Sequence, residues 1–287
     1  MQPPKPLTGP PPAPILMAHV STDLAELLAN VPHAFVMVEH ETVTVREDLA
    51  EVTQDEFAAL QQTIAPARRT SCLANLIAAR RAVTLCTMKH LGLNVSPHDI
   101  YLAHRAEGKP ELRISNAAHA KAFQEMDISL ADGYGLSVAW VGPSPVGVDL
   151  EVVEARNCKT WRGLLGDDGY SLALKIERET REPFDSAATR VWTLLEAGKK
   201  AFWLRRILPR FASSLANSWL SFKADDAGDG GEFICALLQH RNETGTVAAL
   251  TVTLGQSTLA ASMPAAGKKN CTRVAGASAG NDVHALD

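Results

Sequence analysis

The chain has 287 residues and 46% hydrophobic residues, which is enough for a buried core and argues against global disorder. Its formal net charge of −4 excludes a general basic surface of the kind that binds nucleic acids. No apolar run reaches the roughly 18 residues of a membrane span, and the five cysteines are scattered without CxxC pairs. These features predict a cytoplasmic protein that binds neither nucleic acid nor membrane.

The two ends of the chain lack the pattern of folded elements. Seven prolines fall within the first 14 residues, so residues 1–14 are predicted to be a linker. Residues 263–287 are mainly small and polar and are predicted to be a disordered tail. Between them we expect an N-terminal lobe over 15–152 and a C-terminal lobe over 153–262.

In the first half, helices and strands follow one another. The pattern predicts a short helix over 21–30, then a β-hairpin from 33–38 and 42–45. Thr53 and Glu56 have the spacing of a capping box that opens a helix. Further elements are a long helix over 67–90, a strand over 100–103, and an antiparallel meander from strands 128–131, 136–141 and 146–151.

The second half repeats this layout. Helical segments are predicted over 161–165 and 168–178, a longer helix over 187–206, and strands over 219–223, 232–238 and 246–254. A long helix followed by antiparallel strands therefore occurs twice. This order predicts an α+β fold of two similar lobes, each with a long helix packed on a small antiparallel sheet.

Four charged residues stand out by their spacing. Asp149 and Glu151 are two apart on a predicted strand and so share a face, whereas Glu196 and Lys200 are four apart on a predicted helix. Carboxylates are ligands that Mg²⁺ prefers, and a nearby lysine offsets phosphate charge. The alternative is that Glu196 and Lys200 form an ordinary surface ion pair.

A series of motifs carries a specific resemblance. Gly-Lys-Pro at 108–110, Ile-Ser-Leu-Ala-Asp-Gly at 128–133, Val-Gly-Val-Asp-Leu-Glu at 146–151 and Trp-Thr-x-x-Glu-Ala-x-x-Lys at 192–200 occur in that order. The series resembles that of the 4'-phosphopantetheinyl transferases. The similarity is to the larger, pseudo-dimeric type that activates nonribosomal peptide and polyketide synthases, including versions built into synthases. It implies a monomer with its active site in a cleft between two lobes.

The resemblance also implies a reaction and its residues. The phosphopantetheine arm of coenzyme A would pass to a serine of an acyl or peptidyl carrier protein, with release of 3',5'-adenosine diphosphate. Asp149, Glu151 and Glu196 would hold Mg²⁺, Glu196 would take the serine proton, and Lys200 would contact the diphosphate. Further coenzyme-binding positions are expected at Arg68, Arg69, Lys109 and Asp132.

The chain departs from the family pattern at two places. Ala131-Asp132 stands where the family usually has Ser-His, and Leu195 stands where it has Lys. In the family both of these residues lie near the coenzyme phosphate, which the negative charge of Asp132 would repel. Lys199 or Arg190 could supply the missing charge, or a carrier held nearby could make weak affinity sufficient. A degenerate copy that binds carrier protein without catalysis is the third possibility.

Other basic residues allow two interpretations each. Arg80 and Arg81 fall in mid-helix and are expected to be solvated or ion-paired rather than bound to ligand. Arg205, Arg206 and Arg210 form a small basic cluster. It is either a docking patch for an acidic carrier protein or a solvated helix end.

Overall fold

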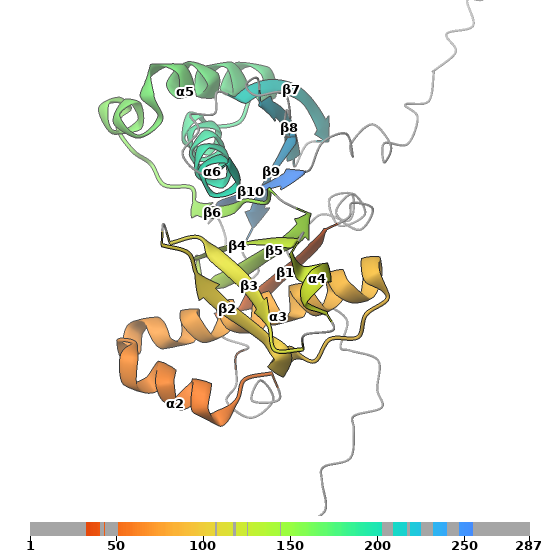
Figure 1. The fold of residues 1–287 in the computed structure, drawn as a ribbon. Helices are drawn as coiled ribbons and strands as arrows, with labels where there is room; N and C mark the ends of the chain where they lie inside the picture. The colour runs from red at the N-terminus through yellow and green to blue at the C-terminus, as the bar shows by residue number, and fades with distance from the viewer. Residues whose placement is uncertain are drawn as a thin grey trace, which may run out of the picture.

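The computed structural model describes residues 33–40, 43, 51–106, 108–116, 119–124, 126–143, 145–202, 209–216, 219–224, 232–239 and 247–254. The linker expected over 1–14, the helix over 21–30 and the tail over 263–287 lie outside the described residues. So do Arg205 and Arg206, and Arg210 is described in its backbone only. The described part is an α+β fold of helices and small antiparallel sheets, as expected (Figure 1).

Three antiparallel sheets are found among the described residues. The first has the strand order β1-β5-β4, the second β6-β10-β9-β8-β7, and the third is the β2-β3 hairpin. The strands are β1 (Ala34–Glu39), β2 (Ile100–His104), β3 (Pro110–Ile114), β4 (Met126–Gly133), β5 (Leu136–Pro143), β6 (Val148–Val152), β7 (Pro209–Ala216), β8 (Trp219–Ala224), β9 (Glu232–Gln239) and β10 (Val247–Leu254). Short helical elements are η4 (Pro97–Asp99) and α4 (Ala120–Phe123).

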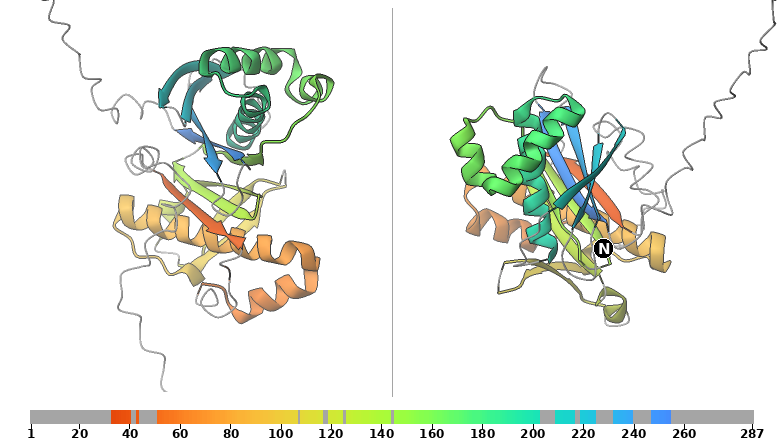
Figure 2. Two further views of the ribbon diagram at one scale, coloured as in Figure 1. Left: turned by 180° about the vertical axis from the view of Figure 1, so that it is seen from behind. Right: turned by 90° about the horizontal axis from the view of Figure 1, so that it is seen from above.

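The long helix α3 (Pro66–Leu91) covers the outer face of the three-stranded sheet (Figure 2). Its apolar stripe packs on Val36 and Val141 in one hydrophobic cluster. The preceding helix α2 (Gln54–Thr63) begins with the predicted capping box. Arg80 is fully buried in α3 and pairs with Glu56 at 2.6 Å, so it is a structural residue, as expected.

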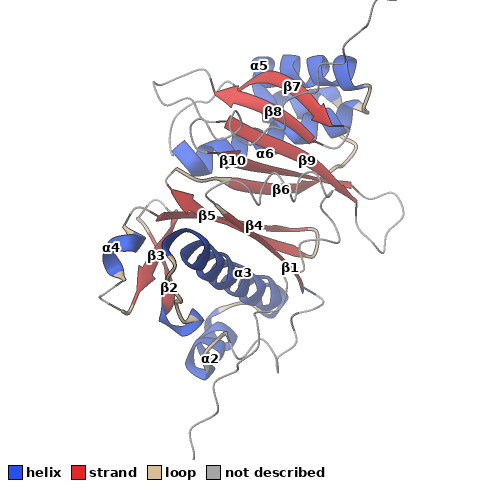
Figure 3. Ribbon diagram, turned by 90° about the vertical axis from the view of Figure 1, so that its right-hand side faces the viewer, coloured by secondary structure: helices blue, strands red, loops and turns tan. Residues whose placement is uncertain are grey.

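The five-stranded sheet carries α5 (Cys158–Thr180) and α6 (Phe184–Phe202) on its outer face. The two predicted segments of α5 adjoin at Gly166, whose φ of 68° interrupts the helical path. In α6, Val191 and Leu194 are buried against the sheet residues Phe233 and Ala249. The order from one side of the molecule to the other is thus α3, sheet, sheet, α6 (Figure 3).

The inner faces of the two larger sheets share one core. Phe35 and Trp140 of the first sheet belong to the same buried cluster as Leu150 and Leu250 of the second. The Trp140 indole also donates a hydrogen bond of 2.7 Å to the carbonyl of Thr253. This shared core fixes how the sheets lie on each other.

The expected meander is wrong at its third strand. β4 and β5 pair as predicted, but β6 pairs with β10, with Asp149 opposite Thr251. The prolines 143 and 145 end β5 because they cannot donate to a ladder, and the chain then crosses to the other sheet. β1 pairs with β5, and the expected hairpin partner over 42–45 lies outside the described residues except for residue 43. None of the described helices is both long and apolar enough to cross a membrane.

Candidate functional site

β6 and α6 bring residues from two of the motifs into contact. The Lys200 Nζ atom near the end of α6 lies 2.7 Å from Asp149 Oδ1 on β6. The same ammonium donates to the carbonyls of Val148 at 3.1 Å and Leu130 at 3.3 Å. Its three N–H donors therefore have three acceptors, and Lys200 links α6 to both β4 and β6.

A close approach of backbones makes this contact possible. A β-carbon at Gly147 would lie only 2.0 Å from the carbonyl oxygen of Ala197 in α6. Gly147 is also anchored from β10, because its N–H donates to Thr253 Oγ1 at 2.8 Å and its carbonyl accepts from the Thr253 amide at 2.9 Å. Only glycine lets β6 lie this near the helix that carries Glu196 and Lys200.

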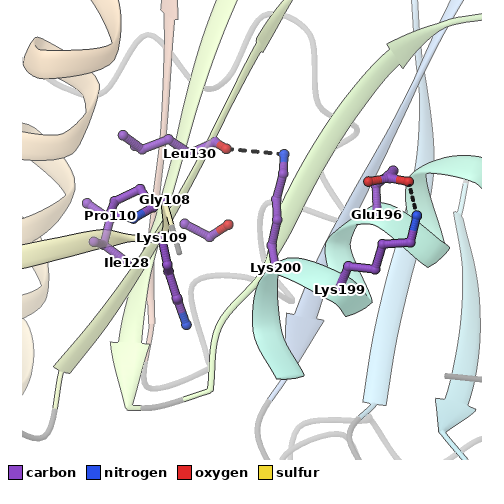
Figure 4. Close-up of a pocket in the computed structure, with 9 residues that line it drawn as sticks. Gly108, Lys109, Pro110, Ile128, Leu130, Glu196, Lys199 and Lys200 are labelled. Carbon is purple, nitrogen blue, oxygen red and sulfur yellow. Dashed lines mark hydrogen bonds and ion pairs between the residues drawn. The ribbon is translucent and has the colours of Figure 1, made fainter. Parts of the chain in front are cut away.

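A cavity of about 470 Å³ opens beside the contact. The turn at 108–110 and β4 residues 128–130 line one side, and Glu196, Lys199 and Lys200 of α6 line the other (Figure 4). The residues of the first and second halves of the chain thus face each other across this space.

Each lysine that lines the cavity is ion-paired with an acid. Lys109 is buried and pairs with Asp127, which also accepts the Val146 amide. Lys200 pairs with Asp149, and Lys199 pairs with Glu196 at 2.5 Å. The exposed fractions of the lysine side chains are 7% for Lys109, 33% for Lys200 and 60% for Lys199. An incoming anion therefore reaches Lys199 with the least disruption.

Burial disfavours the ionised forms of the two acids of β6, Asp149 and Glu151. Burial raises the pKa of Asp149, and the charge of Glu196 adds to this while Lys200 opposes it. Burial and the neighbouring Asp149 charge raise the pKa of Glu151, and a hydrogen bond from the Trp192 side chain opposes the rise. A cation placed between such acids would relieve their mutual repulsion.

The donor set suits a hard divalent cation, although its members are not gathered around one point. Asp149 Oδ2 is buried and has no hydrogen-bond partner among the described residues. Carboxylate oxygens of Asp149, Glu151 and Glu196 are the ligand type that Mg²⁺ takes. In the described part of the chain, however, no three His, Cys, Asp or Glu residues form a group that could hold a metal ion.

Several predicted coenzyme contacts lie elsewhere. Arg69 donates to the carbonyls of Ile64 at 3.0 Å and Gln61 at 2.6 Å, and so caps the end of α2, whereas Arg68 is exposed at the start of α3. Asp132 is exposed and accepts from Ser71 Oγ at 2.5 Å and Asn75 Nδ2 at 3.2 Å, both on α3. Neither these arginines nor Asp132 line the cavity.

Two further expectations about the missing charge are decided by packing. Arg190 is buried, pairs with Glu182 at 3.1 Å and donates to the Cys235 carbonyl, so it cannot serve a ligand in the cavity. Leu195 packs in the cluster between α5, α6 and the sheet, away from the cavity lining. Lys199 remains the candidate for the missing cation.

The sequence did not single out Ser129, Leu130 or Trp192 as site residues. Ser129 and Leu130 line the cavity, and Ser129 Oγ accepts the Val148 amide at 3.0 Å. The Lys199 ammonium lies 5.5 Å from the centre of the Trp192 ring. All three lie within the motif segments 128–133 and 192–200, so the motifs identified the segments of the site but not every residue in it.

Two solved structures are similar to part of this chain. No protein-family model and no curated protein matches the chain. Among solved structures, holo-[acyl-carrier-protein] synthase from Helicobacter pylori, in complex with coenzyme A, has 17% identity and a TM-score of 0.27, over 39% of this chain and 99% of that one. The Neisseria meningitidis holo-[acyl-carrier-protein] synthase has 20% identity and a TM-score of 0.30, over 39% and 96%.

Proposed function

We propose that the protein transfers the 4'-phosphopantetheine arm of coenzyme A to a serine of an acyl or peptidyl carrier protein. The single observation that carries this proposal is the 2.7 Å contact between Lys200 and Asp149, which joins the strand motif to the helix motif. In this proposal the protein acts as a cytoplasmic monomer of two lobes, 15–152 and 153–262.

The cavity supports the proposal by its place and size. It is lined from both halves of the chain, as a site between two lobes requires. Its volume of about 470 Å³ lies in the range of small-molecule sites. Asp132 does not line it and instead accepts hydrogen bonds from Ser71 and Asn75 on α3, which lessens the repulsion expected between Asp132 and a coenzyme phosphate.

The proposed reaction is a displacement at phosphorus. The carrier serine oxygen attacks the phosphorus that bears the pantetheine arm, and Glu196 accepts the serine proton. The bond from that phosphorus to the bridging oxygen breaks, and 3',5'-adenosine diphosphate leaves with the electron pair. Lys200, at the wall of the cavity, offsets the charge that develops on the leaving group.

The other predicted site residues would bind the metal ion and the coenzyme. Asp149, Glu151 and Glu196 would hold Mg²⁺ once Asp149 and Glu196 leave Lys200 and Lys199, and the ion when bound would neutralise charge on the diphosphate. Arg68 is exposed at the start of α3, outside the cavity lining. Arg69 and Lys109 would first have to leave their present partners, the end of α2 and Asp127.

A loading assay tests the proposal. Apo-carrier protein, coenzyme A and Mg²⁺ are incubated with the protein, and mass spectrometry detects the added arm. A carrier in which the acceptor serine is alanine is the control and must remain unmodified. If no modified carrier protein is found at millimolar coenzyme A, the proposed activity is rejected.

One observation favours a second candidate, a non-catalytic module that binds carrier protein. All three lysines of the cavity are already paired with acids, and Arg190 is buried elsewhere. A site without a free phosphate clamp would bind coenzyme weakly. Calorimetry that detects carrier binding by a protein inactive in the loading assay would support this candidate.

A further inference from the structure

The last turn of α6 places Lys199 between a carboxylate and an aromatic ring. Lys199 Nζ lies 2.5 Å from Glu196 Oε1 and 5.5 Å from the centre of the Trp192 ring. Lys199 and Glu196 both line the cavity (Figure 4). Lys199 therefore holds the carboxylate that the proposed function uses as a base.

This pair is the weakest of the three ion pairs at the cavity. Side-chain exposure is 60% for Lys199 and 25% for Glu196, so water screens their attraction. Lys109 and Asp127, in contrast, are both nearly buried, and Lys200 has two backbone carbonyls besides Asp149. A doubly charged anion in the cavity would compete for Lys199 before it could detach the other two lysines.

We propose that Lys199 is the phosphate-binding cation of this site and that the ligand's phosphate takes it from Glu196. The exchange replaces one carboxylate partner by phosphate oxygens and moves the ammonium off Trp192. Anion binding thereby frees Glu196 Oε1, so the carboxylate becomes available only when the coenzyme is in place. This inference rests on the proposed function for the role of Glu196, but the exchange itself needs only a phosphate ligand.

Trp192 reports this exchange directly. Titration of the metal-free protein with inorganic pyrophosphate should change its tryptophan fluorescence, because a cation leaves the indole face. The change should be absent in Trp192→Phe and in Lys199→Met. Coenzyme A should reproduce it, and pantetheine, which has no phosphate, should not.

Affinity gives a second readout. Lys199→Met should weaken pyrophosphate binding about tenfold or more, since a charge-assisted hydrogen bond is lost. Lys199→Arg should restore most of the affinity. The matched control is Lys175→Met, which removes an exposed lysine of an ion pair on α5 outside the cavity lining. Equal pyrophosphate affinity of Lys199→Met and Lys175→Met would overturn the inference.

The outcome separates this inference from the proposed function. If Lys199→Met loses pyrophosphate binding and the wild type does not load carrier protein, the role of Lys199 as an anion-binding residue is supported and the proposed transferase activity is rejected. Carrier loading by the wild type, with unchanged binding in Lys199→Met, would keep the transferase and reject the role of Lys199.

Discussion

Gly147 and Ala197 approach so closely that a β-carbon on Gly147 would lie 2.0 Å from the Ala197 carbonyl oxygen. The same missing side chain faces the Ala201 amide nitrogen at 2.9 Å. Both neighbours are backbone atoms of α6, which cannot rotate away as a side chain would. This contact sets the separation between β6 and α6, and thereby the distance from Asp149 to Lys200.

Gly147→Ala should therefore push β6 from α6. We expect a loss of about 1–3 kcal/mol in the free energy of unfolding, the usual cost of overpacking. Carrier loading should fall as well, because Asp149 and Lys200 separate. Urea unfolding and the loading assay measure the two effects.

Gly163→Ala is the matched control. Gly163 lies in α5, and a β-carbon there would meet no atom within 4 Å. Alanine in a helix is favoured over glycine by up to about 1 kcal/mol, so stability should rise or stay the same. A Gly147→Ala protein as stable and active as Gly163→Ala would contradict the role of this contact.

Asp149→Asn should separate activity from stability. Burial raises the pKa of Asp149, so the folded protein binds its proton more tightly than the unfolded chain does. The ionised carboxylate thus costs free energy at neutral pH, and a neutral amide should leave the melting temperature unchanged or higher. Loading should nevertheless fall by about 100-fold, as when one preorganised charged group is removed from a site.

Asp132→Asn is the comparison for that variant. Asp132 bonds to Ser71 and Asn75 and does not line the cavity, so the Michaelis constant for coenzyme A should not change. A marked gain in the coenzyme affinity of Asp132→Asn would show that the charge of Asp132 acts on the bound coenzyme. Wild-type loading by Asp149→Asn would reject the assignment of Asp149.

The sequence predicted those parts of the fold that depend on local pattern. The helical period over 67–90 matches α3, and the capping box at Thr53 opens α2, because nearby residues determine both. The pairing of β6 was not predictable in the same way. Its partner β10 lies about a hundred residues later, and strand alternation does not specify which sheet a strand joins.

The site was predicted by segment rather than by residue. The motif segments on β6 and α6 lie against each other, and Asp149 and Lys200 are in contact there. The sequence contains Lys109 and Asp127 but does not reveal that they pair in the interior. On β4, the carbonyl of Leu130 accepts from Lys200 at the cavity, whereas the Asp132 side chain bonds to α3, and only the packing of β4 against α3 and α6 determines which groups reach the cavity.

The Lys109–Asp127 pair should contribute stability. Asp127→Asn keeps the shape of the side chain but leaves the Lys109 ammonium buried without a counter-charge, which should cost about 3–5 kcal/mol. Arg113→Met breaks the Arg113–Glu111 pair, in which the arginine is 67% exposed, and should cost under about 1 kcal/mol. Denaturant unfolding of both variants compares them. Similar losses would mean that Lys109 is not held by Asp127 in solution.

His33 should make the fold sensitive to mild acid. Its ring stacks on Trp140 at 4.8 Å, and its nitrogens are buried without a partner among the described residues. Burial, followed by the charges of His90 and Lys89, lowers the pKa of His33 from 6.5 to about 4. As the pH falls below 6.5, the unfolded chain gains a proton that the folded protein does not bind until about pH 4. Stability from this group is thus complete above pH 6.5 and declines towards pH 4, by up to about 3 kcal/mol.

His33→Phe removes the titrating group while it keeps an aromatic ring on Trp140. The decline in unfolding free energy between pH 6.5 and 4 should be smaller in this variant than in the wild type, whatever its absolute stability. His98→Phe, at an exposed position in η4, is the control and should keep the wild-type slope. Measurement of unfolding in urea at a series of pH values gives both slopes. Parallel curves for His33→Phe and the wild type would show that His33 takes up its proton equally in the folded and unfolded states, contrary to the buried position described above.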